Sequence, residues 1–208
     1  MQIVDISRVL REGTAVWPGD TPYELQQTLD RAQGDSVNLT TLTLSAHTGS
    51  HVDAPLHFSD AGASIDQVDL APYWGPAQMV TVTKADGPLF PADFAAYDLS
   101  LAPRLLVRST ASDVDQALFP EAFVYPSPEL ADFLAGLGII LYGSDAPSMD
   151  HQDSKSLEGH NALAGQGIAI LEWLDLRRVE DGLYELVALP LRIAAGDGSP
   201  VRAALRRP

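Results

Sequence analysis

Short apolar segments with a two-residue period dominate the hydrophobic pattern of this chain. From residue 41 to residue 46, threonine or serine alternates with leucine or alanine, which predicts a β-strand that leads directly into His47. Brief apolar runs bounded by turn residues predict further strands. These are Gln2–Ile6, Gln78–Thr83, Arg104–Arg108, Ile139–Tyr142, Ile168–Leu171 and Leu183–Leu189. The predicted fold is therefore rich in short strands.

Helical signals are confined to two segments. Ser127 as N-cap and Pro128 at the first helical position predict a helix that stops at the glycines 136 and 138. Its apolar face is expected to consist of Leu130, Phe133, Leu134 and Leu137. A second, shorter helix is expected over Ala92–Tyr97. Many short strands with two or three helices predict a mixed α/β fold, with residues 1–208 as a single domain.

Composition and charge narrow the partners of this domain. The 208 residues carry a formal net charge of −15, so nucleic acid and anionic membrane surfaces are not expected as partners. The chain has no cysteine, so any metal must be held by nitrogen and oxygen ligands. Neither a secretory signal nor a run of eighteen apolar residues is visible, and we expect a cytoplasmic protein.

The densest group of potential metal ligands lies in residues 47–57, which hold three of the five histidines and a carboxylate. In extended backbone, His51 and Asp53 point to the same face, with their Cα atoms about 6.6 Å apart. An imidazole and a carboxylate at that spacing can reach one ion at about 2.0–2.2 Å. Metal binding is the simplest physical reason to place these side chains together.

The outer histidines of the segment reach the same ion only if the chain bends. A straight strand would hold His47 and His57 about 33 Å apart, and Gly49 and Pro55 lie where bends cost least. Solvated loop histidines, or a helix with histidines four residues apart, would need no metal, but the glycine and the proline argue against the helix. We therefore interpret three side chains as metal ligands, namely His47, His51 and Asp53. His57 lies beyond the proline, and its ligation stays open.

Two further residues gain significance from such a site. Glu172 interrupts the apolar run 168–174, where a carboxylate needs a partner unless it lies at a strand end and faces water or Arg177. His160 lies alone among small residues, which by itself is more typical of a histidine without a ligand role. A metal held by residues 47–53 has coordination positions left to fill, so both side chains are candidate ligands.

The remaining candidates point to simpler roles. Asp145 follows a predicted strand and is interpreted as the residue that holds an Asx-type turn, in preference to a functional role. His151 is expected to be a solvated surface histidine. The chain has neither a Gly-x-Ser-x-Gly nucleophile elbow nor a glycine-rich phosphate loop, and it has no cysteine nucleophile. Metal-assisted hydrolysis is the chemistry that remains.

The segment His-Thr-Gly-Ser-His-Val-Asp-Ala-Pro-Leu-His-Phe at 47–58 resembles the signature His-x-Gly-Thr-His-x-Asp-x-Pro-x-His-Phe of the cyclase-like metal hydrolase family. Ser50 stands where threonine is usual, and every candidate ligand is kept. The resemblance extends over the chain through residues 17–22, 143–148 and 159–163, and to Glu172. Within the family, the chain is most similar to the bacterial arylformamidases.

The resemblance implies a compact swivelling β/β/α domain, usually a homodimer, with two zinc ions in each subunit. It assigns His47, His51 and Asp53 to the first zinc and His160 to the second, with Asp53 and Glu172 as bridging ligands. It makes His57 a catalytic acid/base and places Trp17 against an aromatic substrate. Manganese or cobalt would also suit nitrogen and oxygen ligands.

The implied reaction is hydrolysis of N-formyl-L-kynurenine to L-kynurenine and formate in tryptophan degradation. Hydrolysis of another aryl or cyclic amide, such as isatin, is the alternative within the same chemistry. A binding module with a purely structural metal is an alternative of another class. Structural zinc sites are usually closed by four protein ligands, whereas catalytic sites keep a position for water. Measuring the bound metal and the hydrolytic activity would distinguish an enzyme from a binding module.

Overall fold

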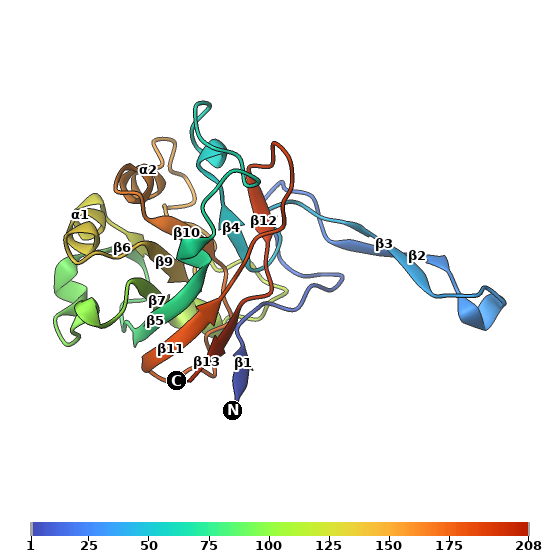
Figure 1. Ribbon diagram of the computed structural model, residues 1–208, viewed down its shortest axis with the longest axis horizontal. Helices are drawn as coiled ribbons and strands as arrows, with labels where there is room; N and C mark the ends of the chain where they lie inside the picture. Colours follow the sequence, from blue (N-terminus) through green and yellow to red (C-terminus); the bar gives the residue numbers. More distant parts are fainter. Residues whose placement is uncertain (1, 208) are drawn as a thin grey trace.

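A nine-stranded, curled sheet forms the framework of the protein in a computed structural model that describes residues 2–207 (Figure 1). Four neighbouring strands at its centre, β5, β7, β9 and β10, run parallel, and the other neighbours are antiparallel. In spatial order the strands are β1 (Ile3–Asp5), β13 (Ala204–Arg206), β11 (Gly182–Val187), β5 (Trp74–Thr81), β7 (Arg104–Arg108), β9 (Leu141–Ser144), β10 (Ala169–Glu172), β4 (His51–Asp53) and β12 (Gly198–Pro200).

Two helices and two small sheets complete the described structure. Helix α1 covers Pro128–Gly136 and α2 covers Glu158–Gly165. The small sheets pair β2 (Glu24–Leu29) with β3 (Leu39–Thr43), and β6 (Gly87–Leu89) with β8 (Val124–Pro126). The prediction of a mixed α/β fold is confirmed. None of the helices within residues 2–207 has the length and apolar character needed to cross a membrane.

Apolar side chains fill both faces of the curled sheet. On one face, Leu130 and Leu134 of α1 and Leu163 of α2 pack in a cluster with strand residues such as Leu105 and Ile170. On the other face, the two ends of the chain contribute to a second cluster, whose members include Ile6, Val52, Leu106, Leu171 and Leu205. Full burial of each such side chain stabilises the fold by about 1.5–3 kcal/mol, so the sheet is held rigidly from both sides.

Helix α1 forms as its sequence signals indicate. Ser127 has extended backbone, and its Oγ accepts a hydrogen bond from the Leu130 amide at 3.1 Å. Of the four side chains expected on the apolar face, Leu130 and Leu134 are buried, whereas Phe133 is 42 % exposed and Leu137 is 36 % exposed. The helix expected over Ala92–Tyr97 is wrong as an α-helix, because the chain there forms only a 3₁₀ turn, Pro91–Phe94. That turn starts at a proline and closes after four residues.

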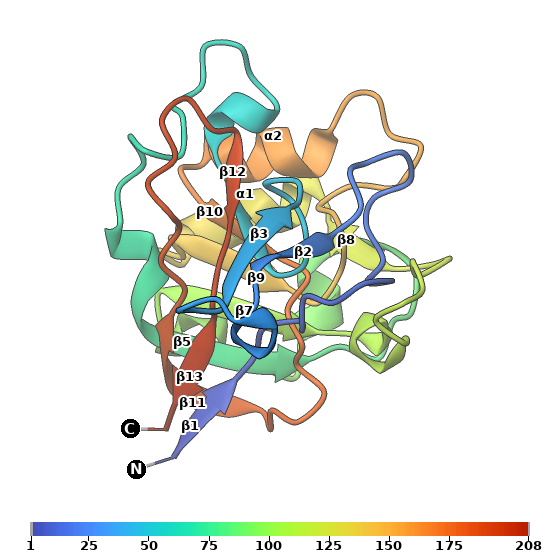
Figure 2. The same cartoon turned by 90° about the vertical axis from the view of Figure 1, so that its right-hand side faces the viewer.

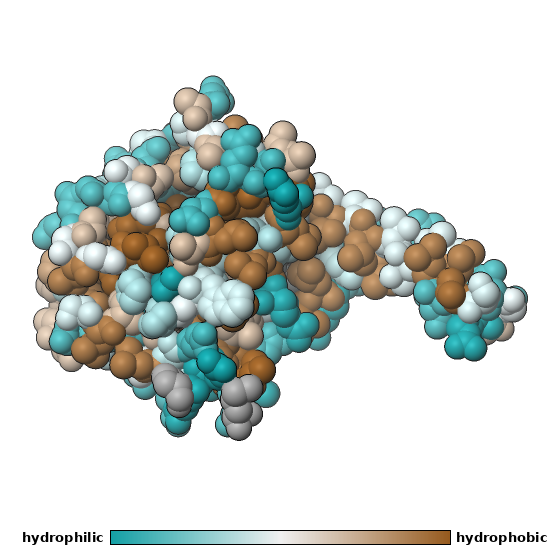
Figure 3. Space-filling view, in the orientation of Figure 1, coloured by the Kyte–Doolittle hydropathy of each residue, from teal (hydrophilic) through white to brown (hydrophobic). Residues whose placement is uncertain are grey.

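The strand expected over residues 41–46 is displaced. The structure has β3 at Leu39–Thr43, so the strand ends four residues before His47 and does not lead directly into it. It pairs with β2 in a two-stranded arm that extends away from the body, and Figure 2 shows the arm pointing toward the viewer. The alternating leucines do not form a buried face here, because Leu42 is 51 % exposed and Leu44 is only half-buried. Figure 3 shows hydrophobic residues on the surface of the arm.

Candidate metal centre and active site

Strands β4 and β10 bring the candidate ligands together. The two strands pair antiparallel with Glu172 directly opposite His51, and Asp53 lies two residues along β4 on the same face. Before β4 the chain turns at Gly49, whose φ of +67° suits glycine, and after it a 3₁₀ turn begins at Pro55. The bends expected at these two residues are therefore present.

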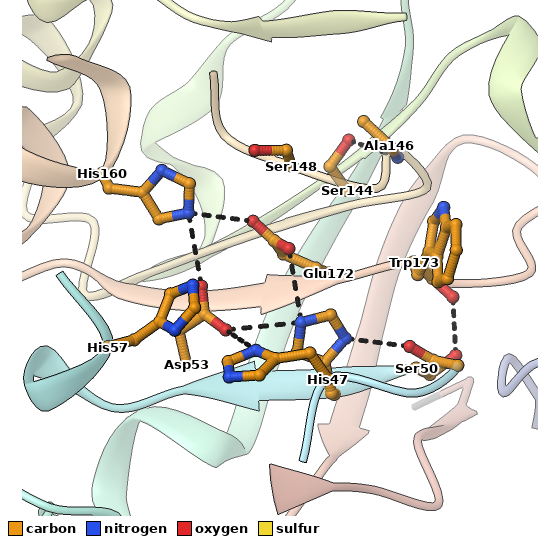
Figure 4. A network of polar contacts seen from close by, with 12 residues as sticks. His47, Ser50, Asp53, His57, Ser144, Ala146, Ser148, His160, Glu172 and Trp173 are labelled. Carbon is orange, nitrogen blue, oxygen red and sulfur yellow. Dashed lines mark hydrogen bonds and ion pairs between the residues drawn. The ribbon is translucent and has the colours of Figure 1, made fainter. Parts of the chain in front are cut away.

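Two imidazole nitrogens each face the same two carboxylates. His51 Nε2 lies 3.3 Å from Asp53 Oδ1 and 3.3 Å from Glu172 Oε2. His160 Nε2 lies 3.4 Å from Asp53 Oδ2 and 3.4 Å from Glu172 Oε1 (Figure 4). In a tetrahedral site with bonds of about 2.0–2.1 Å, neighbouring ligand atoms are about 3.3–3.4 Å apart. These spacings fit side chains that could hold divalent ions between them.

Each of three histidines is held by an acceptor behind it, so that its other ring nitrogen faces the carboxylates. The pairs are His51 Nδ1 with Gly49 O at 2.9 Å, His160 Nδ1 with Asp150 Oδ2 at 2.6 Å, and His47 Nε2 with Asp197 Oδ2 at 3.0 Å. The second nitrogen of His47 lies 3.0 Å from Asp53 Oδ1. Such outer partners are typical of metal-binding histidines, because they fix the tautomer and the direction of the ring.

Burial makes this cluster costly unless a cation joins it. His51, Asp53, His160 and Glu172 are all at most 4 % exposed. Asp53 Oδ2 and Glu172 Oε1 are buried and accept no hydrogen bond of ordinary geometry, and a buried oxygen in that state costs free energy. Divalent ions would satisfy these oxygens. The residues present therefore fit a metal centre with a nitrogen and oxygen donor set.

The surrounding carboxylates favour the protonated form of the histidines. Burial opposes the charge on His51, but hydrogen bonds to Asp53 and Glu172 outweigh it and raise the pKa of His51 to about 10. The three histidines around Asp53 hold the pKa of that carboxyl well below its usual value, against the effect of burial. A metal ion must therefore displace at least one proton from the histidines when it binds.

We expect metal affinity to rise with pH for this reason. His51 is protonated at about pH 7 and loses its proton as the pH rises toward about 10, so competition by the proton weakens with increasing pH. For each proton displaced, the apparent affinity should rise about tenfold per pH unit. Calorimetric titration of the metal-free protein with Zn²⁺ in two buffers of different ionisation enthalpy measures the protons released. An enthalpy that does not depend on the buffer would contradict the expectation.

His57 lies beside this cluster but differs from the other three histidines. It shares a possible metal group with His47 and Asp53, whose ligand atoms lie within 4.8 Å of one another. However, its side chain is 34 % exposed, and its Nδ1 faces Asp197 Oδ2 at 3.3 Å. The ring stacks on His47 with centroids 4.0 Å apart. The 3₁₀ turn after Pro55 thus places one imidazole at the edge of the cluster, open to the cavity.

Two carboxylates that contact the histidines, Asp150 and Asp197, are not indicated by any pattern in the sequence. Asp150 accepts from the Gly159 and His160 amides and from the His160 ring, so it holds the start of α2 together with the candidate ligand. Asp197 contacts both His47 and His57. A Cβ on the neighbouring Gly198 would lie 2.7 Å from the His47 ring, so only glycine allows this close approach.

Other residues singled out from the sequence have different positions. Asp145 does not form a local Asx turn, which corrects that interpretation; it is fully buried and accepts from the amides of Ser109 and Ser112 and from the Ser109 hydroxyl. Glu172 does not face Arg177, which pairs with Asp175 instead. His151 is exposed, lines the cavity, and contacts the neighbouring Asp153 and the ring of Tyr125.

A cavity of about 490 Å³ opens over the cluster. Residues of the segments 17–20 and 147–157 line it together with His57, Asp197 and four candidate ligands, His47, His51, His160 and Glu172. Trp17 lines the cavity, and its ring meets Phe119 edge-on with centroids 5.3 Å apart. The volume is in the range of pockets for small organic molecules. The cavity is therefore large enough for a small aromatic compound beside the ligand cluster.

Comparison with known proteins points in the same direction. The sequence profile of the family described as "Putative cyclase" matches residues 4–151. A kynurenine formamidase of Bacillus cytotoxicus is 41 % identical over 203 residues, which cover 98 % of this chain and 96 % of that protein. A solved structure described as a potential metal-dependent hydrolase with cyclase activity superposes with a TM-score of 0.84 at 26 % identity, and covers 100 % of this chain and 99 % of that one. Isatin hydrolase A of Labrenzia aggregata has a TM-score of 0.83 at 23 % identity, over 98 % of this chain and 93 % of its own, and shares the fold.

Proposed function

This chain belongs to the cyclase family, and on that premise and the geometry of its ligand cluster we propose that it hydrolyses N-formyl-L-kynurenine to L-kynurenine and formate. The main support for metal-dependent chemistry comes from two carboxylates, Asp53 and Glu172. Two imidazole nitrogens, from His51 and His160, each lie 3.3–3.4 Å from both of them. Identity of 41 % over 98 % of the chain to a kynurenine formamidase supports the choice of substrate.

We assign the ligands of two zinc ions from the contacts of the described side chains. His47, His51 and Asp53 would hold the first ion, and His160 the second, while Asp53 and Glu172 would bridge both. Bound divalent ions lower the pKa of coordinated water toward 7 and polarise the carbonyl that is attacked. The donor set also accepts manganese or cobalt. Asp150 and Asp197 would act behind the ligands, because each fixes the ring of a histidine.

His57 is the proton donor in this proposal. Water adds to the formyl carbon, the carbon–nitrogen bond breaks, and the aryl nitrogen must take up a proton because it leaves poorly as an anion. His57 is the imidazole that is half-open to the cavity, with Asp197 on its Nδ1, so its Nε2 can exchange a proton with the substrate. General acid catalysis of this kind typically contributes about 10²–10⁴-fold in rate.

Trp17 would contact the aromatic ring of the substrate. Its indole lines the cavity together with four of the proposed ligands and meets the Phe119 ring edge-on. Aromatic pairs in this geometry contribute about 0.5–1.5 kcal/mol beyond burial of their surface. An aryl formamide can therefore lie with its ring against the indole and its formyl group toward the carboxylate-bridged cluster.

The proposed function is tested by turnover of N-formyl-L-kynurenine with zinc-loaded protein, followed by the absorbance of the product. We expect rapid hydrolysis that stops after treatment with a chelator and returns when Zn²⁺ is added. Isatin, assayed in parallel, examines the alternative suggested by the isatin hydrolase fold. Turnover of isatin alone would overturn the formamidase assignment and keep the metal-dependent chemistry.

We also propose that the enzyme is a homodimer, with the β2–β3 arm in the interface. An isolated two-stranded hairpin is marginally stable in water, and this arm extends from the body with its apolar side chains uncovered. Leu25, Leu39 and Leu42 are each between 45 % and 51 % exposed. A second copy of the chain would bury them and support the arm.

A further inference from the structure

We propose that Lys155 and Asp20 form the subsite for the α-amino acid group of the substrate, with Lys155 on the carboxylate and Asp20 on the ammonium. This inference rests on the proposed function and deepens it. N-formyl-L-kynurenine carries a formamide at one end of its aryl ketone and a zwitterionic amino acid at the other. A cavity that binds the whole molecule therefore needs one cation and one anion away from the metal cluster.

Lys155 is the one lysine or arginine among the described residues that line the cavity. The chain has only two lysines, and the other, Lys84, bonds to Pro88 O at 2.5 Å and lies 3.7 Å from Asp93. Lys155 has no hydrogen bond or ion pair with any residue in the described part of the chain. Its ammonium group is therefore free to bind a carboxylate in the cavity.

The segment that carries Lys155 is held in shape by hydrogen bonds on both sides of it. The Ser154 amide donates to His151 O at 2.8 Å, and the Ser154 hydroxyl accepts from the Leu157 amide at 3.1 Å. Asn161 on α2 donates from Nδ2 to Ser156 O at 2.9 Å. The same segment leads into the helix that carries His160. The backbone at Lys155 is thus supported on both sides and is connected directly to the helix with the candidate metal ligand.

Among the carboxylates that line the cavity, Asp20 is the one available to bind the ammonium group. The other carboxylates that line the cavity, Glu172 and Asp197, already face histidines. Asp20 belongs to a turn closed by its own amide on Trp17 O at 2.9 Å, so the turn presents the carboxylate and the indole together. Its Oδ1 accepts from the Thr21 amide at 2.6 Å, and Oδ2 stays open to a ligand.

The overall charge of the protein makes this local cation important. With 13 basic against 28 acidic residues, the chain has a net charge of −15, and its field does not attract a carboxylate. A zwitterion has no net charge, so it can approach without repulsion. Its carboxylate then needs a nearby cation, and charge-assisted hydrogen bonds supply both affinity and orientation.

The test compares two substrates that differ only in the amino acid group: N-formyl-L-kynurenine and 2-formamidoacetophenone. For Lys155→Met, we expect kcat/KM toward N-formyl-L-kynurenine to fall about tenfold, mainly through KM, which corresponds to ~1.4 kcal/mol. The value for 2-formamidoacetophenone should stay within about twofold, because that substrate makes no such ion pair. Asp20→Asn should follow the same pattern, and Lys155→Arg should keep most of the affinity.

Lys84→Met is the matched control, because it removes the same charge at a residue that does not line the cavity. It should leave both substrates unaffected. Equal losses toward both substrates in Lys155→Met, or no loss toward either, would overturn the subsite while wild-type activity upholds the proposed function. A wild-type enzyme that hydrolyses 2-formamidoacetophenone but not N-formyl-L-kynurenine would overturn both, and the two failures are thereby distinguished.

Discussion

If Asp53 bridges two ions as proposed, Asp53→Asn should release both of them and lower kcat/KM by at least about a thousandfold. Three histidines face the Asp53 carboxylate: Oδ1 lies 3.0 Å from His47 and 3.3 Å from His51, and Oδ2 lies 3.4 Å from His160. Asparagine keeps the size but supplies one neutral oxygen and an NH₂ group that repels a cation. Neither ion would then keep its shared ligand. Metal content by mass spectrometry and turnover of N-formyl-L-kynurenine measure the two effects.

Asp60→Asn is the control for this variant. Asp60 is exposed, follows the same segment of the chain and undergoes the same loss of charge. It should keep both the metal and the activity. A thermal unfolding curve shows whether Asp53→Asn remains folded; a folded variant with a full metal load would contradict the assignment of Asp53 as a bridging ligand. Glu172→Gln should behave like Asp53→Asn, because its two oxygens face His51 and His160 in the same way.

His57→Ala should keep its metal and lose about 10²–10⁴-fold in kcat. The ring is 34 % exposed and faces Asp197, whereas each of the other three clustered histidines directs a nitrogen at Asp53. Removing it therefore takes away a proton donor and leaves the bridging carboxylates in place. Because the ring is open to the cavity, added imidazole should restore part of the activity. A ligand histidine would not give this combination of retained metal and chemical rescue.

The matched variant for His57 is His151→Ala, which removes another cavity-rim imidazole outside the ligand cluster. It should retain both its metal and its kcat. Loss of metal from His57→Ala in proportion to the loss of activity would make His57 a ligand and would overturn its role as acid. Retained metal with unchanged kcat would move the proton donor elsewhere in the cavity.

The sequence predicts the local part of the site well, and geometry explains why. His47, His51 and Asp53 lie within seven residues, so their spacing, with Gly49 as the bend, is visible without a fold. The contribution of Glu172 depends on the antiparallel register of β4 and β10, which no local pattern encodes. In the sequence, Glu172 is therefore noticeable only because it is a carboxylate within an apolar run.

Other parts could not be predicted, because their causes lie far away in the chain. Asp197 contacts a histidine 150 residues earlier, and an aspartate in a glycine-rich loop is otherwise ordinary. Helix α2 begins after Leu157, which has a φ of 48° and provides no side-chain cap, so the usual start signal is missing. The alternation at residues 41–46 predicts a strand, and β3 overlaps that range. The alternation also suggests one buried face, whereas every residue of β3 is exposed in the arm.

The order of strands also determines when during synthesis the site can form. The histidine-rich strand β4 leaves the ribosome early, but its partners β10 and β12 come from residues 169–172 and 198–200, close to the end of the chain. At the opposite edge of the sheet, β1 can pair with β13 only after Ala204–Arg206 have been synthesised. Contacts of such long range form late and slowly. We therefore expect the ligand cluster to assemble only after β12 has been translated, because a nascent chain that ends before Gly198 lacks one of the two strands that pair with β4.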